Sequence, residues 1–166
     1  MSHLRSLSNR GNLHCQSREP LLQGSAMFPS ASRCAMGRIR ASVTLLNPTA
    51  PALQGLEVSA LADSGAVHLC IPEHLALQLQ LRELERREVV LADGHRRSGP
   101  YMGPVEVRFA NRRCFTGAMV LGDQVLGDEV LLGAIPMEDM DLVLQPQLQQ
   151  LTVNPASPNL PTSVAK

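Results

Sequence analysis

The chain has 166 residues, with 15 Lys and Arg against 15 Asp and Glu, so its formal net charge is zero. The length predicts a single domain, and no apolar stretch approaches the roughly 20 residues of a membrane span, which excludes an integral helical membrane protein. Aromatic residues make up only 2% of the sequence and no basic run is interleaved with them, so a nucleic-acid-binding surface is also excluded.

The four cysteines, Cys15, Cys34, Cys70 and Cys114, are far apart and form no Cys-x-x-Cys pair. The sequence also lacks the apolar segment of a secretory signal. We therefore predict free thiols in a reducing compartment and a cytoplasmic location.

Residues 1–35 are rich in Ser, Arg, Gly and Asn and show little hydrophobic periodicity, which predicts disorder. Two hypotheses account for this segment: the biological chain starts at Met36, or the segment is a transit-like presequence. We predict a folded domain over 36–154 and a proline-containing tail over 155–166.

The hydrophobic pattern of the first part of the domain predicts three strands. Apolar residues alternate from Arg38 to Leu46, a second strand runs over 56–61 towards Asp63, and a third returns over 67–71. Pro72 and Glu73 are typical of a helix start. The residues that follow conflict, because leucines at every second position over 75–81 indicate a strand whereas Leu, Ala and Gln favour a helix.

The second part predicts further short strands. A strand over 88–92, an Asp93-Gly94 turn and a return strand reaching Phe109 form a hairpin. A turn over 110–113 leads to a strand over 114–121, and the last strands are expected over 142–144 and 148–153. Many short strands at close spacing predict a mainly β protein, a small closed β-barrel with one or two short helices.

Two motifs stand out in this pattern. Asp63-Ser64-Gly65-Ala66 lies between two apolar strands, where Asp-Ser-Gly is good turn chemistry as well as a possible site. Downstream, Leu131-Leu132-Gly133 ends another apolar run and is followed by a short helical segment over 134–140. Together the motifs resemble the retropepsin-like aspartic proteases, and more narrowly their small bacterial members, over a region from about Arg38 to Val153.

The resemblance implies the barrel of that family and a short helix after Pro72. It implies that Asp63 is the catalytic carboxylate, that Ser64 locks two copies of the loop together, and that Gly65 and Ala66 keep the loop small. It further implies that two other segments serve the site: Leu131, Leu132 and Gly133 as support beneath the loop, and Ala92, Asp93, Gly94 and His95 as a flap, although an ordinary exposed hairpin is the alternative for the flap.

An aspartic peptidase needs two carboxylates that share one proton, one to activate water and one to protonate the carbonyl oxygen. The chain contains one Asp-Ser-Gly and is too short for two lobes. The expected partner is therefore a second copy, with Asp63 of each facing the other across a two-fold axis. The expected substrate is a polypeptide and no cofactor is implied. The alternative is the same fold retained as a non-catalytic dimerisation or peptide-binding module.

Two features depart from the family pattern, and two others suggest different chemistry. Ala62 precedes the aspartate where the family often has Val, and terminal strands that join viral dimers are not recognisable. His68, Cys70 and His74 suggest a metal site, but a fourth ligand is lacking and we predict no metal. Cys70 as a nucleophile lacks a supporting pattern beyond the two histidines.

Overall fold

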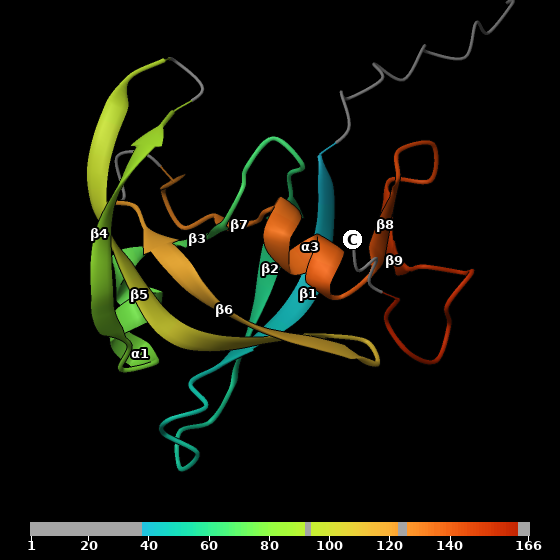
Figure 1. The fold of residues 1–166 in the computed structure, drawn as a ribbon, viewed down its shortest axis with the longest axis horizontal. Coiled ribbons are helices and arrows are strands. Elements are labelled where there is room, and N and C mark those ends of the chain that lie inside the picture. Colours follow the sequence, from blue (N-terminus) through green and yellow to red (C-terminus); the bar gives the residue numbers. More distant parts are fainter. Residues whose placement is uncertain (1–37, 92–93, 123–125, 163–166) are drawn as a thin grey trace, which may run out of the picture. The chain divides into compact units, whose positions relative to one another are not determined.

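Six strands of a seven-stranded sheet close into a ring, as the computed structural model of the chain shows (Figure 1). The structure describes residues 38–91, 94–122 and 126–162. The sheet order is β1-β2-β7-β3-β6-β5-β4, and additional pairing of β1 with β5 closes the ring and leaves β4 outside it. The elements are β1 (Ile39–Leu46), β2 (Leu56–Ala62), β3 (Leu69–Ile71), α1 (Glu73–Gln78), β4 (Arg82–Val90), β5 (Arg96–Phe109), β6 (Arg112–Val120), β7 (Val130–Leu132), α3 (Ala134–Asp139), β8 (Leu142–Gln145) and β9 (Gln150–Val153).

The mainly β barrel with short helices that the sequence predicts is confirmed. Alternation explains β1, where Val43 and Leu45 are buried and Ser42 is exposed, because neighbouring side chains of a strand point to opposite faces. The segment after Pro72 is a helix, so residue propensity and the resemblance prevail over the leucine alternation. Leu75, Ala76 and Leu79 of this region pack into the barrel core.

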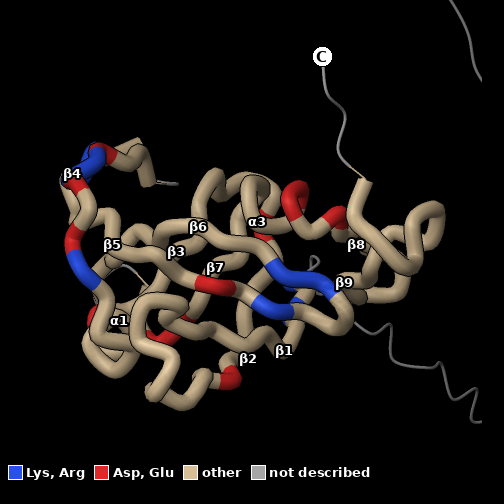
Figure 2. Tube along the Cα trace, turned by 60° about the horizontal axis from the view of Figure 1, so that its bottom comes forward, with Lys and Arg blue, Asp and Glu red and all other residues tan. Residues whose placement is uncertain are grey.

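The strand expected over 88–92 begins earlier, at Arg82. The sequence obscured this start because residues 82–88 are mostly charged and nearly all exposed, so no apolar alternation marks them. Figure 2 shows acidic and basic residues alternating along β4. Within the described residues β4 pairs with β5 alone, so it is an edge strand and both its faces can carry charge.

The core is aliphatic, as the shortage of aromatic residues predicts. The innermost side chains come from most strands of the ring and from the residues beside both helices. The largest of them, all less than 2% exposed, include Leu45, Leu69, Ile71, Leu79, Met119, Leu132 and Met140.

The β8–β9 hairpin forms a separate two-stranded sheet, and the chain after it is fastened to the barrel. The Asp141 carboxylate accepts hydrogen bonds from the Asn154 side chain (2.9 Å), the Ser157 hydroxyl and the Thr162 amide (3.0 Å). The guanidinium of Arg112, the first residue of β6, donates to the Ser157 carbonyl. Residues 154–162 are therefore held at both of these points.

In the part of the chain that the structure describes, no helix is long and apolar enough to cross a membrane. Cys70 and Cys114 are both buried and free. Cys15 and Cys34 lie outside the described residues.

We predict that Asp141→Ala loosens residues 154–162 and lowers stability at pH 7. The hydrogen bonds from Ser157, Asn154 and Thr162 hold the pKa of the Asp141 carboxyl below its usual range. Their contribution is complete above the unfolded-state pKa of about 3.9 and is lost as the pH falls through the lower folded-state pKa. Urea denaturation at pH 7 and near pH 2, with amide exchange of residues 154–162, measures this.

The matched control is Asp128→Ala, because Asp128 is an exposed acid outside this network. Equal denaturation midpoints for the two variants at pH 7 would contradict the prediction.

Candidate active site

Asp63 follows β2 directly and begins the site loop, residues 63–68, which leads to β3. Its amide donates to the Leu132 carbonyl (3.1 Å), and its own carbonyl accepts from the Ala66 amide (3.2 Å). The Gly65 amide donates to Oδ1 of the Asp63 carboxylate at 2.8 Å. An Asp side chain that caps a backbone amide two residues on is typical of such turns. The carboxylate is thus oriented by its own loop.

The predicted support motif lies beside this loop. β2 and β7 are parallel neighbours, with Ala62 opposite Leu132. After β7 the chain continues along the loop, since the Ala134 amide donates to the Ala66 carbonyl (2.7 Å) and the Ile135 amide to the Val67 carbonyl (3.0 Å). The site loop is therefore anchored along its length by residues 132–135.

A glycine is needed at position 133 because a side chain would not fit there. Backbone conformation does not require it, since the φ of Gly133 is an ordinary −79°. A Cβ atom at this position would lie 2.3 Å from the His68 carbonyl oxygen and 2.8 Å from that of Ala66. Both contacts are backbone atoms of the site loop, which cannot move aside without disturbing Asp63. The Leu-Leu-Gly motif thus ends in the residue that permits the closest approach.

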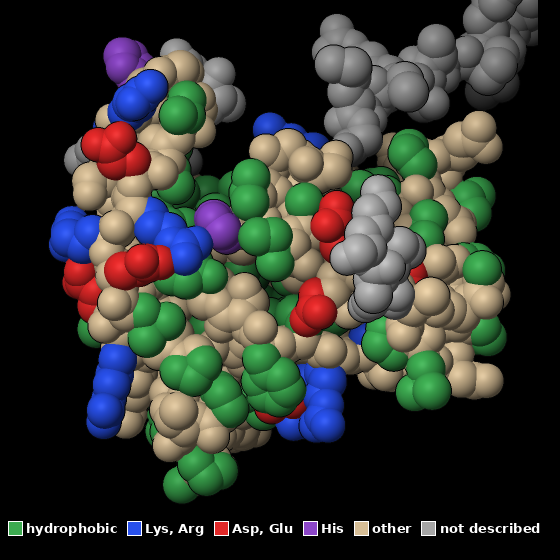
Figure 3. Space-filling model, in the orientation of Figure 1, with side chains coloured by type: hydrophobic (Ala, Val, Ile, Leu, Met, Phe, Trp, Pro, Cys, Tyr) green, Lys and Arg blue, Asp and Glu red, His purple; other side chains and the backbone are tan. Residues whose placement is uncertain are grey.

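Asp63 faces a cavity of about 590 Å³, within the usual size of ligand sites. Residues of the site loop and β3 line one side of this cleft: Asp63, Gly65, Ala66, Val67, His68 and Cys70. The β4 end of the hairpin and nearby core residues line the rest: Glu88, Val89, Val90, Leu91, Met119, Leu121 and Leu131. Figure 3 shows charged side chains gathered along β4 and hydrophobic side chains spread over the rest of this view of the molecule.

The hairpin predicted as a flap is present, and its stem borders the cleft. The Leu91 amide donates to the His95 carbonyl (2.9 Å) and the Gly94 amide to the Leu91 carbonyl (2.8 Å). Gly94 has a φ of +81°, a left-handed conformation that favours glycine. Ala92 and Asp93, also predicted for the flap, lie outside the described residues.

The exposed part of the loop carries apolar as well as polar groups. Ser64 and Gly65 are exposed, and the side chains of Val67 and Ile135 are 57% and 43% exposed. The hydrogen bond between the Ile135 amide and the Val67 carbonyl makes these two residues neighbours. Two exposed aliphatic side chains therefore adjoin the loop that carries Asp63.

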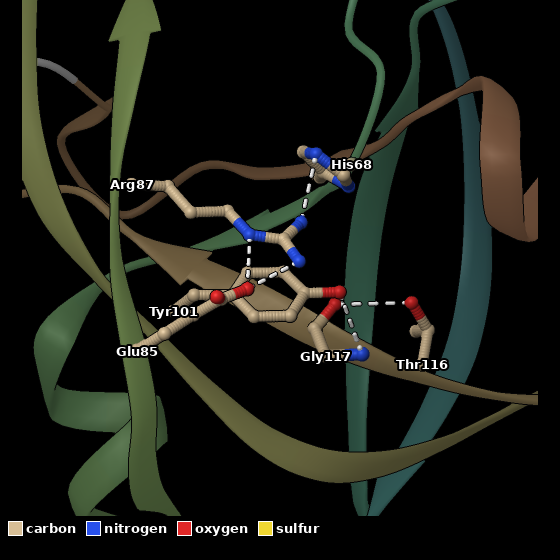
Figure 4. Close-up of polar contacts among 6 residues, drawn as sticks. All are labelled: His68, Glu85, Arg87, Tyr101, Thr116 and Gly117. Carbon is tan, nitrogen blue, oxygen red and sulfur yellow. Dashed lines mark hydrogen bonds and ion pairs between the residues drawn. The ribbon is translucent and has the colours of Figure 1, made fainter.

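Sequence reasoning missed one cluster beside the cleft. Arg87 of β4 contacts His68 of the site loop and stacks on Tyr101 of β5, as Figure 4 shows. His68 entered the sequence analysis only as a metal ligand, and Arg87 and Tyr101 not as site residues at all. The only signal was the two-residue spacing of Glu85 and Arg87, which places both on one face of a strand.

The alternatives for His68 and Cys70 gain no support. Within the described ranges no group of three or more His, Cys, Asp or Glu side chains is placed to hold a metal ion. Burial, together with the nearby Asp63 charge, raises the pKa of the Cys70 thiol to about 11. Such a thiol is protonated near neutrality and is a poor nucleophile.

Comparison with known proteins finds likenesses among solved structures. No family model matches the sequence, and no curated protein matches it. Among solved structures the chain is similar to the retroviral protease-like domain of Ddi1 from Leishmania major, at 17% identity and a TM-score of 0.48. The alignment covers 71% of this chain and 89% of that one.

We predict that Gly133→Ala destabilises the fold by about 1–3 kcal/mol or more, because the added methyl group overlaps two backbone carbonyls of the site loop. Chemical denaturation measures the loss. Gly122→Ala is the control, since its Cβ would meet nothing within 4 Å, and it should change stability by less than about 0.5 kcal/mol. Equal effects of the two substitutions would show that Gly133 is not a packing constraint.

Proposed function

We propose that the protein is an aspartic endopeptidase of the retropepsin-like type, active as a homodimer with one Asp63 from each subunit. The observation that carries this proposal is the Asp63 carboxylate, held by the Gly65 amide and turned towards a cleft of about 590 Å³. The Asp-Ser-Gly-Ala and Leu-Leu-Gly motifs that resemble this family are also the segments that hydrogen bond to each other. The substrate class is a polypeptide, which enters the cleft between the site loop and the hairpin.

The chemistry uses two carboxylates at hydrogen-bonding distance. The ionised one takes a proton from water as the water attacks the scissile carbonyl, and the neutral one donates its proton to the carbonyl oxygen. Like charges this close resist joint ionisation, so the two carboxylates share one proton. The hairpin would exclude bulk water when it folds over a bound peptide.

A single chain supplies one such aspartate. Glu88 also lines the cleft, but it lies on the exposed edge strand and pairs loosely with Arg96 (3.8 Å), without the amide that orients Asp63. The second carboxylate is therefore assigned to the second copy. A two-fold axis beside Asp63 would also bury Ser64, Val67 and Ile135 against the partner, and the exposure of these side chains supports that arrangement.

Asp63→Asn should abolish peptide cleavage, with a loss of at least about 10²–10⁴-fold, because the amide cannot share the proton of the dyad. Cleavage of a peptide library by the purified protein from pH 3 to pH 7 measures this, and the wild-type rate should peak in mild acid. Asp128→Asn, an exposed acid outside the cleft, is the control and should keep wild-type activity.

A mixing experiment tests whether the aspartates act in pairs. Excess Asp63→Asn protein added to wild type should suppress cleavage as subunits exchange, because mixed dimers carry one carboxylate. Cleavage that persists in Asp63→Asn itself would locate the chemistry elsewhere. A confirmed wild-type dimer that cleaves nothing would favour the non-catalytic peptide-binding module.

Ile135→Asp should weaken the dimer by at least about tenfold, because it places a charge beside the two-fold axis in the proposed interface. Sedimentation over a range of concentrations measures the dissociation constant, and activity should fall in parallel. Leu148→Asp is the control, since Leu148 is 64% exposed in the β8–β9 turn and away from the site loop. Equal dissociation constants for the two variants would refute this interface.

A further inference from the structure

Among the described residues, a contact between the side chains of Arg87 and His68 connects the two sides of the cleft, and the proposed mechanism does not use it. Nη1 of Arg87, on β4, lies 3.2 Å from Nε2 of His68, on the site loop (Figure 4). His68 lines the cleft, and so do residues Glu88–Leu91, which follow Arg87 along β4. The contact therefore joins the site-loop side of the cleft to the hairpin side.

Arg87 is held in a fixed position. Its guanidinium carbon lies 3.7 Å from the centre of the Tyr101 ring, and the Glu85 carboxylate accepts from its Nε and Nη2. The Tyr101 hydroxyl in turn accepts from the Gly117 amide at 3.1 Å. A Cβ at Gly117 would lie 2.4 Å from the Tyr101 ring, so the missing side chain makes room for it. The strands β4, β5 and β6 together thus aim the guanidinium at His68.

The contact requires a neutral imidazole. A guanidinium has donors only, so Nε2 of His68 must accept and the ring proton belongs on Nδ1. Protonation would place an N–H of His68 against an N–H of Arg87 and add a second cation beside the first. Nδ1 is buried and has no hydrogen-bond partner, so no acceptor stabilises the imidazolium from the other side.

The surroundings of His68 agree with this assignment. Burial, and after it the Arg87 charge, lower the pKa of His68 from its ordinary value. Of the acids on β4, Glu85 is engaged by Arg87 and Glu88 is exposed. The titratable and charged groups near His68, from the site loop, β3, β4 and β5, are Asp63, Cys70, Glu85, Arg87, Glu88 and Tyr101.

We propose that Arg87 is a positioning residue that joins the two sides of the cleft through neutral His68, and that protonation of His68 opens the cleft. The inference rests on the proposed function, because it is the substrate cleft whose width the pair controls. Peptide binding is then favoured while His68 is neutral, and it weakens in acid for a reason separate from the Asp63 dyad. Below the His68 midpoint, KM should increase as the pH falls, approaching a tenfold increase per pH unit, because the fraction of protein with neutral His68 decreases. This step leaves kcat unaffected.

The first test is an NMR pH titration of the full-length protein, which needs no activity. The His68 ring should titrate below the ordinary histidine value, and Arg87→Gln should move its midpoint up. Amides of Val89–Leu91 should lose exchange protection over the same pH range. Arg86→Gln is the control, because Arg86 is the adjacent β4 arginine and pairs with Glu83 (3.6 Å) rather than with His68.

His68→Gln supplies a second test that retains an acceptor for Arg87 at every pH. In this variant the hairpin amides should keep their protection in acid, and KM should lose its rise. A His68 midpoint at or above the ordinary value, or one that Arg87→Gln leaves unchanged, would overturn the inference. Retention of the acid rise in KM by His68→Gln would overturn it as well.

The two proposals fail in different ways. One outcome is that the His68 titration midpoints and the amide protection of the hairpin behave as expected while the wild-type protein cleaves no peptide. In that case the role of the Arg87–His68 contact stands and the peptidase assignment fails. If cleavage requires Asp63 but the His68 midpoint is ordinary, the peptidase stands and the role of Arg87 is refuted.

Discussion

The site depends on the close approach of two backbone segments that are about 70 residues apart in the sequence. The parallel pairing of β2 with β7 brings the chain after Leu132 alongside the loop that begins at Asp63. Gly133 lets the two backbones meet, and the amides of Ala134 and Ile135 fasten the far end of the loop. The Asp63 backbone takes part in this arrangement, since its amide donates to the Leu132 carbonyl. The barrel thus positions the loop, and the Gly65 amide orients the carboxylate within it.

This dependence explains why one short motif says so little alone. Asp-Ser-Gly by itself predicts an ordinary turn. It indicates a functional site only when a second segment anchors the turn so that its aspartate faces a cleft. The Leu-Leu-Gly motif indicates such a segment because a strand followed by a side-chain-free residue suits tight packing. The structure brings the two motifs into hydrogen-bonding contact, which is a physical reason for them to occur together.

The sequence predicted the elements whose residues carry their own signal. Alternation marked β1, turn chemistry marked the β4–β5 hairpin, and the two motifs marked the loop and its support. Sequence analysis failed where a contact depends on residues that are far apart in the sequence. Nothing local indicates that Arg87 reaches His68, because the contact depends on how β4 registers with β5 and how Tyr101 fits over Gly117. The fastening of residues 154–162 was missed for the same reason, since Asp141 and Arg112 lie far from Ser157 in the sequence.

The charged strand β4 has a consequence for how the protein associates. Closure of the ring by β1 and β5 satisfies the backbone of the other strands, so within the described sheet β4 presents its unpaired amides and carbonyls to solvent. Such an edge can template intermolecular strand addition and aggregation. Here an incoming strand would have to desolvate rows of Arg and Glu side chains on both faces, and only a segment of matching charge pattern would be tolerated. The composition that hid this strand from sequence analysis thus protects the molecule from joining others edge to edge.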